Sequence, residues 1–332
     1  DTCRSDIEVD GHPVRIGLCI GIAVFPDNGS DAKTIFNNAD IALYRAKSEL
    51  RGSVRLFDSE MGAELRDRRA MQSELRAAVQ EGEISLHYQP QAMINGEVFG
   101  FEALARWHSP RRGAVAPAKF IPLAEETGLI IPLGEKILRD ACREAAAWER
   151  PLQVAVNISP VQFRHADLVS RIHSILFETG LSPHRLEIEV TESAFIEDFS
   201  RTLSILRRLK SIGVRIALDD FGTGYSSLSY LHAFPFDKIK IDRTFVCDIE
   251  HNQHSVAVIR AIVGLGHSLG VPVLAEGVES KAQCAVLAAE GCTEIQGYLI
   301  GRPRPIEKYS LLLRDAGAAK TPGRGELTAA QS

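Results

Sequence analysis

The chain has 332 residues, of which 45% are hydrophobic and 24% are charged, the profile of an ordinary soluble globular protein. That length fits one large domain with an appendage, or two smaller domains. The formal net charge of -5 excludes a general attraction to a nucleic acid polymer or to an anionic membrane surface. An anionic ligand would therefore need local neutralisation by basic side chains or metal ions.

Residues 1–57 read as a small segment of their own. The run VRIGLCIGIAVFP (14–26) predicts a strand, residues 31–52 predict a helix that ends in glycine, and residues 54–57 predict a last short strand. Two strands and one helix supply too little sheet and core to fold alone. We therefore expect this segment to be poorly packed and easily cleaved by proteases.

Residues 58–83 predict a linker and a charged lead-in helix (61–83), after which strand-like and helix-like runs alternate. Strands are predicted at 84–90, 98–107, 152–159, 185–193, 215–220, 238–242, 272–278 and 294–300. Helical runs, several of which end in glycine, separate the later ones. The pattern predicts the α/β class and a TIM-like (β/α)8 barrel over residues 84–314. A doubly wound open sheet is the alternative, but no dinucleotide-binding fingerprint follows the first strand.

Cysteine usage and the absence of targeting signals favour a cytoplasmic chain. The six cysteines show no close metal-type pairing and no disulfide framework. The start, DTCRSDIEVDG, does not read as a signal peptide, and no apolar run reaches transmembrane length. We expect no membrane contact by this chain, which leaves open an anchor upstream in a longer parent protein. The small-residue-rich tail, 315–332, is expected to be flexible.

The carboxyl ends of the strands carry the chemistry in a barrel of this kind. The polar residues predicted there are Glu102, Arg106, Asn157, Glu189, Glu192, Asp219, Asp220, Lys240, Asp242, Glu276, Glu279 and Gln296. Any one of these residues could equally form a salt bridge, support a turn or belong to a functional site. Their coincidence at seven strand ends favours a functional site. Clustered carboxylates repel one another unless cations lie among them, and oxygen ligands suit Mg²⁺ or Mn²⁺ rather than zinc. Two such ions about 4 Å apart would activate water and hold a phosphodiester.

The pair Asp219–Asp220 lies in the run VRIALDDFGTGYSSLSYL (214–231). Side chains alternate between the two faces of a strand, so both aspartates can serve one site only if the strand ends between them. Gly222 and Gly224 make that ending easy, because glycine takes backbone angles that other residues avoid. We expect Asp219 to bridge two metal ions and Asp220 to turn toward the second. In the run DKIKID, Lys238 lies in phase with Lys240.

The motifs resemble those of EAL-domain proteins, the cyclic di-GMP phosphodiesterases. FEALARW, YQPQ, VNIS, EVTES, DDFGTGYSSL, KIKIDRTFV, AEGVES and QGYLIGRP occur in that family's order, and the resemblance covers residues 66–312. It implies a barrel whose first strand runs antiparallel to the others. It also implies hydrolysis of cyclic di-GMP to linear pGpG with Mg²⁺ or Mn²⁺, two ions being expected, and a homodimer formed through the helices near the fifth strand.

The resemblance also implies a role for each matching residue. The implied metal ligands are Glu102, Asn157, Glu189 and Asp219, with Asp220 at the second ion. The implied catalytic residues are Glu276, as general base, and Lys240, which positions the attacking water. Glu192 is implied to anchor the loop after the fifth strand. The implied substrate-binding residues are Gln89, Arg106, Asp242, Glu279 and Gln296.

Residues 1–57 resemble the C-terminal part of a GGDEF domain, the diguanylate cyclase module, through IGIAVFP, NADIALYRAK and VRLFD. The turn that names that module is absent, so the chain is not expected to be a cyclase. A fragment of a longer tandem protein and a gene product with an eroded cyclase half both stay open. The complete ligand set favours an active phosphodiesterase over a cyclic di-GMP-binding sensor without turnover. Another barrel hydrolase acting on different phosphate esters is a third alternative.

Overall fold

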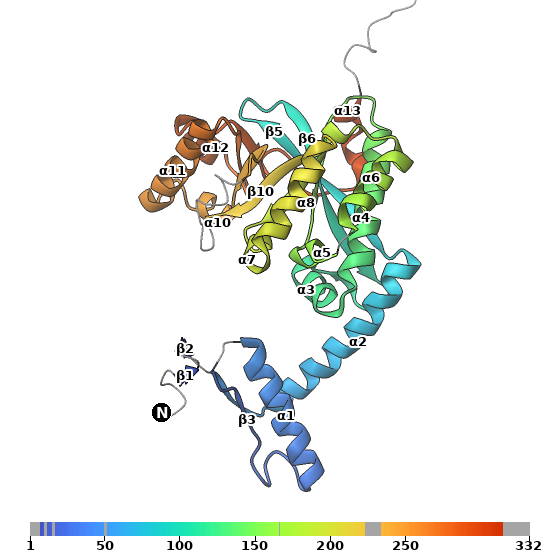
Figure 1. Cartoon of the computed structure of the whole chain (residues 1–332), viewed down its shortest axis with the longest axis vertical. Helices are drawn as coiled ribbons and strands as arrows, with labels where there is room; N and C mark the ends of the chain where they lie inside the picture. The colour runs from blue at the N-terminus through green and yellow to red at the C-terminus, as the bar shows by residue number, and fades with distance from the viewer. Residues whose placement is uncertain are drawn as a thin grey trace, which may run out of the picture. The chain divides into compact units, whose positions relative to one another are not determined.

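The computed structural model describes residues 7–9, 12–14, 17–49, 52–165, 167–222 and 234–314 (Figure 1). The chain divides into two compact units, Asp1–Ala77 and Ala78–Ser332. Helix α2 (Ser59–Glu81) crosses this division, close to the lead-in helix expected over 61–83. The predicted flexible tail, 315–332, lies outside the described residues.

The described part of the first unit contains two small sheets, one further helix and most of helix α2. Strands β1 (Ile7–Val9) and β2 (His12–Val14) pair antiparallel, whereas β3 (Ile20–Ile22) and β4 (Val54–Leu56) pair parallel. Helix α1 (Ala32–Glu49) packs on β3, where Gly21 allows the close approach because a β-carbon there would lie 2.2 Å from the carbonyl oxygen of Ala39. The single strand predicted over 14–26 is therefore wrong in extent, since most of that run lies outside β3.

The second unit is a barrel closed by eight described strands. They are β5 (Ile84–Met93), β6 (Val98–Ser109), β8 (Gln153–Asn157), β9 (Leu186–Thr191), β10 (Arg215–Phe221), β11 (Lys238–Ile241), β12 (Val273–Ala275) and β13 (Glu294–Gln296). Pairing of β5 with β6 closes the sheet, and β5 runs antiparallel to both of its neighbours while the other barrel pairs are parallel. The predicted TIM-like barrel with an antiparallel first strand is confirmed.

Helices cover the outside of the barrel, as α4, α6 and α8 do in Figure 1. The described helices of this unit are α3 (Pro117–Thr127), α4 (Ile130–Ala146), α5 (Pro160–Phe163), α6 (Leu168–Thr179), α7 (Ala194–Glu197), α8 (Phe199–Ser211), α10 (Arg243–Val246), α11 (Gln253–Leu269), α12 (Lys281–Ala289) and α13 (Ser310–Leu313), with 3-10 turns η2 (Pro183–Arg185) and η3 (Ile306–Tyr309). As expected, Gly180 and Gly270 end α6 and α11 in the left-handed conformation that suits glycine.

Alternation along the strands separates an apolar core from a polar barrel interior. On β9, Leu186, Ile188 and Val190 are buried in the core between strands and helices. Glu187 and Glu189, which alternate with them, are buried inside the barrel and meet charged partners there. The barrel therefore encloses polar side chains that reach its carboxyl end.

Several predicted strand limits are corrected by the structure. β5 extends past the predicted end at Pro90 to Met93, and β7 (Gly113–Val115), which was not predicted, pairs with β6. β12 and β13 are shorter than predicted, because the chain turns at Gly277 (φ 72°) and at Gly297. A β-carbon at Gly297 would lie 2.1 Å from the carbonyl oxygen of Val278, so only glycine fits this crossing.

The expected end of the fifth strand between Asp219 and Asp220 is also wrong. β10 continues to Phe221, and its register against β11 shifts between Leu218 and Phe221. Asp220 has φ 54° and is the one non-glycine residue with positive φ in the described ranges. This bulge re-aims a side chain without ending the strand, and aspartate tolerates the left-handed conformation better than most residues. Gly224, which was expected to assist the turn, lies outside the described residues.

The described cysteines, Cys19, Cys142, Cys247, Cys284 and Cys292, are free thiols, as the spacing predicted. Among the described helices, none combines the length and the apolar character needed to cross a membrane.

Candidate active site

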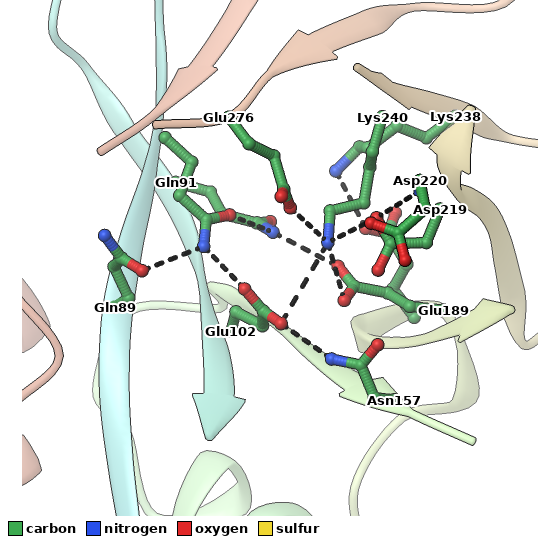
Figure 2. Close-up of polar contacts among 12 residues, drawn as sticks. Gln89, Gln91, Glu102, Asn157, Glu189, Asp219, Asp220, Lys238, Lys240 and Glu276 are labelled. Atoms are coloured by element: carbon green, nitrogen blue, oxygen red, sulfur yellow. Dashed lines mark hydrogen bonds and ion pairs between the residues drawn. The ribbon is translucent and has the colours of Figure 1, made fainter. Parts of the chain in front are cut away.

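Lys240 lies at the centre of a carboxylate cluster at the carboxyl end of the barrel (Figure 2). Its ammonium nitrogen Nζ is 2.6 Å from Glu276, 2.8 Å from Glu189, 3.2 Å from Asp219 and 4.0 Å from Glu102. The lysine side chain is fully buried. Four carboxyl groups, from β6, β9, β10 and the residue after β12, therefore share one buried cation.

A belt of amide side chains connects two of these carboxyl groups, Glu102 and Glu189 (Figure 2). Asn157 Nδ2 donates to one oxygen of Glu102 at 2.6 Å, and Gln296 Nε2 donates to the other at 2.5 Å. Gln296 Nε2 also donates to Gln89 Oε1 at 3.2 Å. Gln91 Nε2 donates to Gln296 Oε1 at 3.0 Å and to Glu189 Oε1 at 3.4 Å. Both oxygens of Glu102 are thus fixed by neutral donors.

Gln91 belongs to this belt, although the sequence prediction did not include it. It follows Gln89 by two residues on β5, so both side chains face the barrel interior. The motif YQPQ contained this signal, but the predicted strand ended at Pro90 and left Gln91 outside it.

Burial and neighbouring charges move the pKa values of the cluster in opposite directions. Burial raises the pKa of Glu102, but Lys240 and the donors Gln296 and Asn157 outweigh it, and the net pKa lies below its usual value. Burial, with the Glu102 charge, raises the pKa of Glu189. Burial raises the pKa of Glu276 to about 8, with Asp219 adding to the effect and Lys240 opposing it. The surrounding carboxylates outweigh burial at Lys240 and raise its pKa, so the ammonium stays charged.

Asp220 and Glu192 lie at the rim of the cluster. Burial, followed by the charges of Asp219 and Asp242, raises the pKa of half-buried Asp220 to about 6. Glu192 Oε1 accepts a hydrogen bond from the Gly222 amide at 3.2 Å. This contact ties the end of β9 to the first residue after β10, next to Asp220.

Asp242 and Glu279 are less closely joined to the cluster. Asp242 caps α10, where its carboxylate accepts from the amide of Thr244 at 3.0 Å and from its hydroxyl at 2.5 Å. Glu279 is exposed, and among the described residues its side chain makes no hydrogen bond or ion pair with the cluster.

The side chains of Arg106 and Glu192 likewise make no described hydrogen bond or ion pair with Lys240 or its four carboxyl partners. The side chain of Gln89 reaches these partners only through Gln296.

A cavity of about 430 Å³ lies against β6 and β8; most of its wall is apolar, and Asn157, which donates to Glu102, connects it to the cluster. Its lining includes Leu104, Arg106, Asn157, Ser159, Pro160 and Thr191. Arg106 is half-buried, and burial lowers the pKa of its guanidinium while Glu102 opposes that effect. A cation and an amide thus face a space of the volume typical of small-molecule sites.

The donor set fits a hard divalent cation in kind, since it consists of carboxylate and amide oxygens. Oxygen Oε2 of Glu189 is buried and accepts no hydrogen bond from the described residues, with only the Lys240 ammonium beside it. Within the same described ranges, no three His, Cys, Asp or Glu side chains already surround a metal position, and the ammonium lies between the carboxylates instead.

Comparison with known families agrees with this architecture. Residues 72–303 match the family model described as EAL domain, and residues 1–53 match the model described as diguanylate cyclase, GGDEF domain. The chain belongs to the EAL-domain family. The resemblance found in the motifs is therefore confirmed for both parts.

Relatives of this EAL-domain chain have been named as enzymes. It is 42% identical over 306 residues to the bifunctional diguanylate cyclase/cyclic di-GMP phosphodiesterase MucR of Pseudomonas aeruginosa. This match covers 91% of this chain and 45% of the relative. It is 41% identical over 303 residues to the cyclic di-GMP phosphodiesterase PdeR of Escherichia coli, covering 88% of this chain and 46% of the relative. The chain thus spans less than half the length of these relatives.

A solved structure described as PaMucR phosphodiesterase in complex with c-di-GMP superposes with a TM-score of 0.69 at 44% identity. The match covers 71% of this EAL-domain chain and 98% of that chain.

Proposed function

We propose that this chain is a metal-dependent phosphodiesterase that hydrolyses cyclic di-GMP to linear pGpG. The observation that carries the proposal is the convergence of Glu102, Glu189, Asp219 and Glu276 on Lys240, beside a cavity lined by Arg106. The names of MucR and PdeR support the substrate and the reaction.

In this proposal Glu102, Asn157, Glu189 and Asp219 hold a Mg²⁺ or Mn²⁺ ion, and Asp220 serves a second. Such ions, when bound, lower the pKa of a bound water and offset charge on the phosphate. The amide donors of Asn157 and Gln296 fix the orientation of Glu102 before any ligand arrives. This preorganisation reduces the reorganisation needed in the reaction.

Glu276 takes the proton from the attacking water in this mechanism. Its carboxylate belongs to the same cluster as the proposed ligands Glu189 and Asp219, so it can reach a water held among them. Lys240, 2.6 Å from Glu276, orients that carboxylate and donates to the water. Because Lys240 also contacts Glu189 and Asp219, it couples the base to the ligand set.

Substrate binding is assigned to the neighbouring polar residues. Arg106, at the wall of the cavity, neutralises a phosphate, while Gln296, which donates to Glu102, and its partner Gln89 contact the substrate beside it. The further contacts of Asp242 and Glu279 with substrate stay predictions, as does the anchoring role of Glu192.

Chromatography of cyclic di-GMP incubated with the chain tests this function. Samples contain Mg²⁺, Mn²⁺ or a chelator, and Glu276→Gln is compared with Glu290→Gln, whose carboxylate pairs with Arg260 on the outer surface. We expect metal-dependent pGpG from the unaltered chain and from Glu290→Gln, and none from Glu276→Gln or from the chelated sample.

Two other outcomes would refute the proposal. Tight binding of cyclic di-GMP without product in every metal would favour a sensor module without turnover. Equal hydrolysis of bis(p-nitrophenyl) phosphate and cyclic di-GMP would favour a less specific phosphate-ester hydrolase.

A homodimer formed through the helices near β10 is a further part of the proposal, supported by the family resemblance. Analytical ultracentrifugation at working concentration should show the dimer, and a monomer alone would contradict it.

A further inference from the structure

A second ionic cluster lies deeper in the barrel, on the side of the amino ends of the parallel strands. We call Glu187, Arg215, Lys238 and Glu294 the lower cluster. Lys238 Nζ is 2.8 Å from Glu187 and 3.3 Å from Glu294, and Arg215 Nε is 3.6 Å from Glu187. The side chains of Lys238 and Glu187 are each only 1% exposed. The proposed hydrolysis uses none of these groups.

Three members of the lower cluster lie on strands of the active site, two residues earlier on each. Glu187 precedes Glu189 on β9, Lys238 precedes Lys240 on β11, and Glu294 precedes Gln296 on β13. Residues two apart on a strand share a face and lie about 6–7 Å apart along it. The side chains of Glu187, Lys238 and Glu294 therefore each lie one level below a side chain of the active site.

These three strands are not neighbours in the sheet. β10 separates β9 from β11, and β12 separates β11 from β13. Backbone hydrogen bonds consequently connect them only through an intervening strand. Lys238 connects all three directly across the barrel interior, since it lies on β11 and pairs with both β9 and β13.

Lys238 is held in this position on its remaining side as well. The ring centroid of Phe99 lies 4.7 Å from its ammonium nitrogen. One oxygen of Glu187 and one of Glu294 accept no hydrogen bond within the part of the chain that the structure describes. Removal of the lysine charge would leave two buried carboxylates with Arg215 as their remaining cation. Buried ion pairs of this kind add little net stability but can specify one arrangement.

We propose that Lys238 is a positioning residue. It fixes how β9, β11 and β13 are placed relative to one another along the barrel axis, and in this way it brings Glu189, Lys240 and Gln296 to the same depth in the barrel. Lys238 contacts none of the reacting atoms. The expected effect on turnover rests on the proposed phosphodiesterase function, whereas the expected effect on Mn²⁺ affinity rests only on the proposed ligand set.

The test separates positioning from stability. Lys238→Met alone would leave Glu187 and Glu294 buried with Arg215 as their remaining cation, and it would strongly destabilise the barrel. The main variant is therefore the triple change Lys238→Met, Glu187→Gln and Glu294→Gln, which removes the ion pairs at similar volume, while the 32% exposed side chain of Arg215 keeps contact with solvent. Glu294→Gln is the milder variant, because it breaks only the link to β13. Lys210→Met is the matched control, since Lys210 pairs with Asp237 at 3.0 Å outside the barrel interior.

Three properties of the full chain are measured for each variant: the Tm, the affinity for Mn²⁺ from the electron paramagnetic resonance signal of free Mn²⁺, and kcat and KM for cyclic di-GMP. The triple variant should unfold near the Tm of the unaltered chain and bind Mn²⁺ about tenfold or more weakly, the usual effect of losing a supporting interaction. Its kcat should fall about tenfold to a hundredfold with KM little changed, as expected for a displaced reacting group. Glu294→Gln should show smaller changes of the same kind, and Lys210→Met none.

Folded triple and Glu294→Gln variants with unchanged Mn²⁺ affinity and kcat would overturn the proposal. If the triple variant does not fold, Glu294→Gln alone decides in the same way. If the unaltered chain binds Mn²⁺ but makes no pGpG, the proposed function fails, and the Mn²⁺ affinities of the variants still decide the role of Lys238. An unaltered chain that binds no Mn²⁺ overturns both proposals.

Discussion

Neutralising Asp220 should stabilise the metal-free protein. This side chain is brought toward the acidic cluster by the bulge in β10, and the pKa of its carboxyl is raised to about 6 by burial and by the charges of Asp219 and Asp242. A raised pKa means that folding disfavours the ionised form. Asp220→Asn removes that charge and keeps a residue type that tolerates the left-handed backbone at φ 54°.

The magnitude follows from the pKa. A change from the ordinary value of 3.8 to about 6 corresponds to about 3 kcal/mol of disfavoured ionisation at neutral pH. The group is half-exposed, so solvent screening reduces this to about 1–2 kcal/mol. In a barrel of this size we expect Asp220→Asn to raise the Tm by about 3–6 °C at pH 7.5.

The pH dependence has a definite sign. Between the two pKa values the folded state binds more protons than the unfolded state, so stability falls as pH rises from about 4 to about 6. Above that window the full penalty is present, and below it the penalty disappears. The advantage of Asp220→Asn should therefore be largest at pH 7.5 and about a third as large at pH 4.5, which lies within that window.

Thermal unfolding in the presence of a chelator measures this effect. Asp220→Ala is the matched control, because it is also neutral but adopts the left-handed backbone less readily, and we expect it to unfold about 2–4 °C below Asp220→Asn. A Tm of Asp220→Asn equal to that of the unaltered chain at pH 7.5 would refute the reasoning. So would a gain of the same size at pH 4.5, since the charge would then not be its cause.

Two further changes test the supporting structure. Glu192→Ala removes the carboxylate that accepts the hydrogen bond of the Gly222 amide, close to Asp220. It should weaken Mn²⁺ binding about tenfold in an electron paramagnetic resonance titration. An unchanged Mn²⁺ affinity would contradict the anchoring role of Glu192. Gly297→Ala places a β-carbon 2.1 Å from the Val278 carbonyl oxygen and should lower the free energy of unfolding by about 3 kcal/mol in a denaturant titration. Gly264→Ala, whose β-carbon would meet nothing within 4 Å, is the control, and an equal loss there would reject the steric explanation.

Strand alternation explains why much of the site could be predicted from the sequence. Glu189 alternates with apolar residues on β9, and Lys240 does so on β11, so their inward direction follows from the period of two. Gln91 was missed because proline usually marks an edge or an end of a strand. Here Pro90 lies within β5, and the strand continues with Gln91 facing inward.

The bulge at Asp220 could not be predicted in the same way. Adjacent aspartates require some break in the alternation, and both a strand end and a bulge provide one. The choice depends on the neighbouring strand: Leu218 lies opposite Ile239 and Phe221 opposite Ile241, so three steps on β10 match two on β11. This mismatch is a property of the pairing and has no counterpart in the local sequence.

Depth along the barrel is a second property that local sequence does not contain. Lys238 and Lys240 occupy one short run, KIKI, and share a face, yet they meet different carboxylates. Lys238 pairs with Glu187 and Glu294, while Lys240 pairs with Glu189, Asp219 and Glu276. The tilt and stagger of the closed barrel decide which level each lysine reaches. A period of two thus predicts that both lysines face inward. Only the register of the strands in the closed barrel shows that Lys240 lies at the depth of the proposed active site and Lys238 at the depth of the lower cluster.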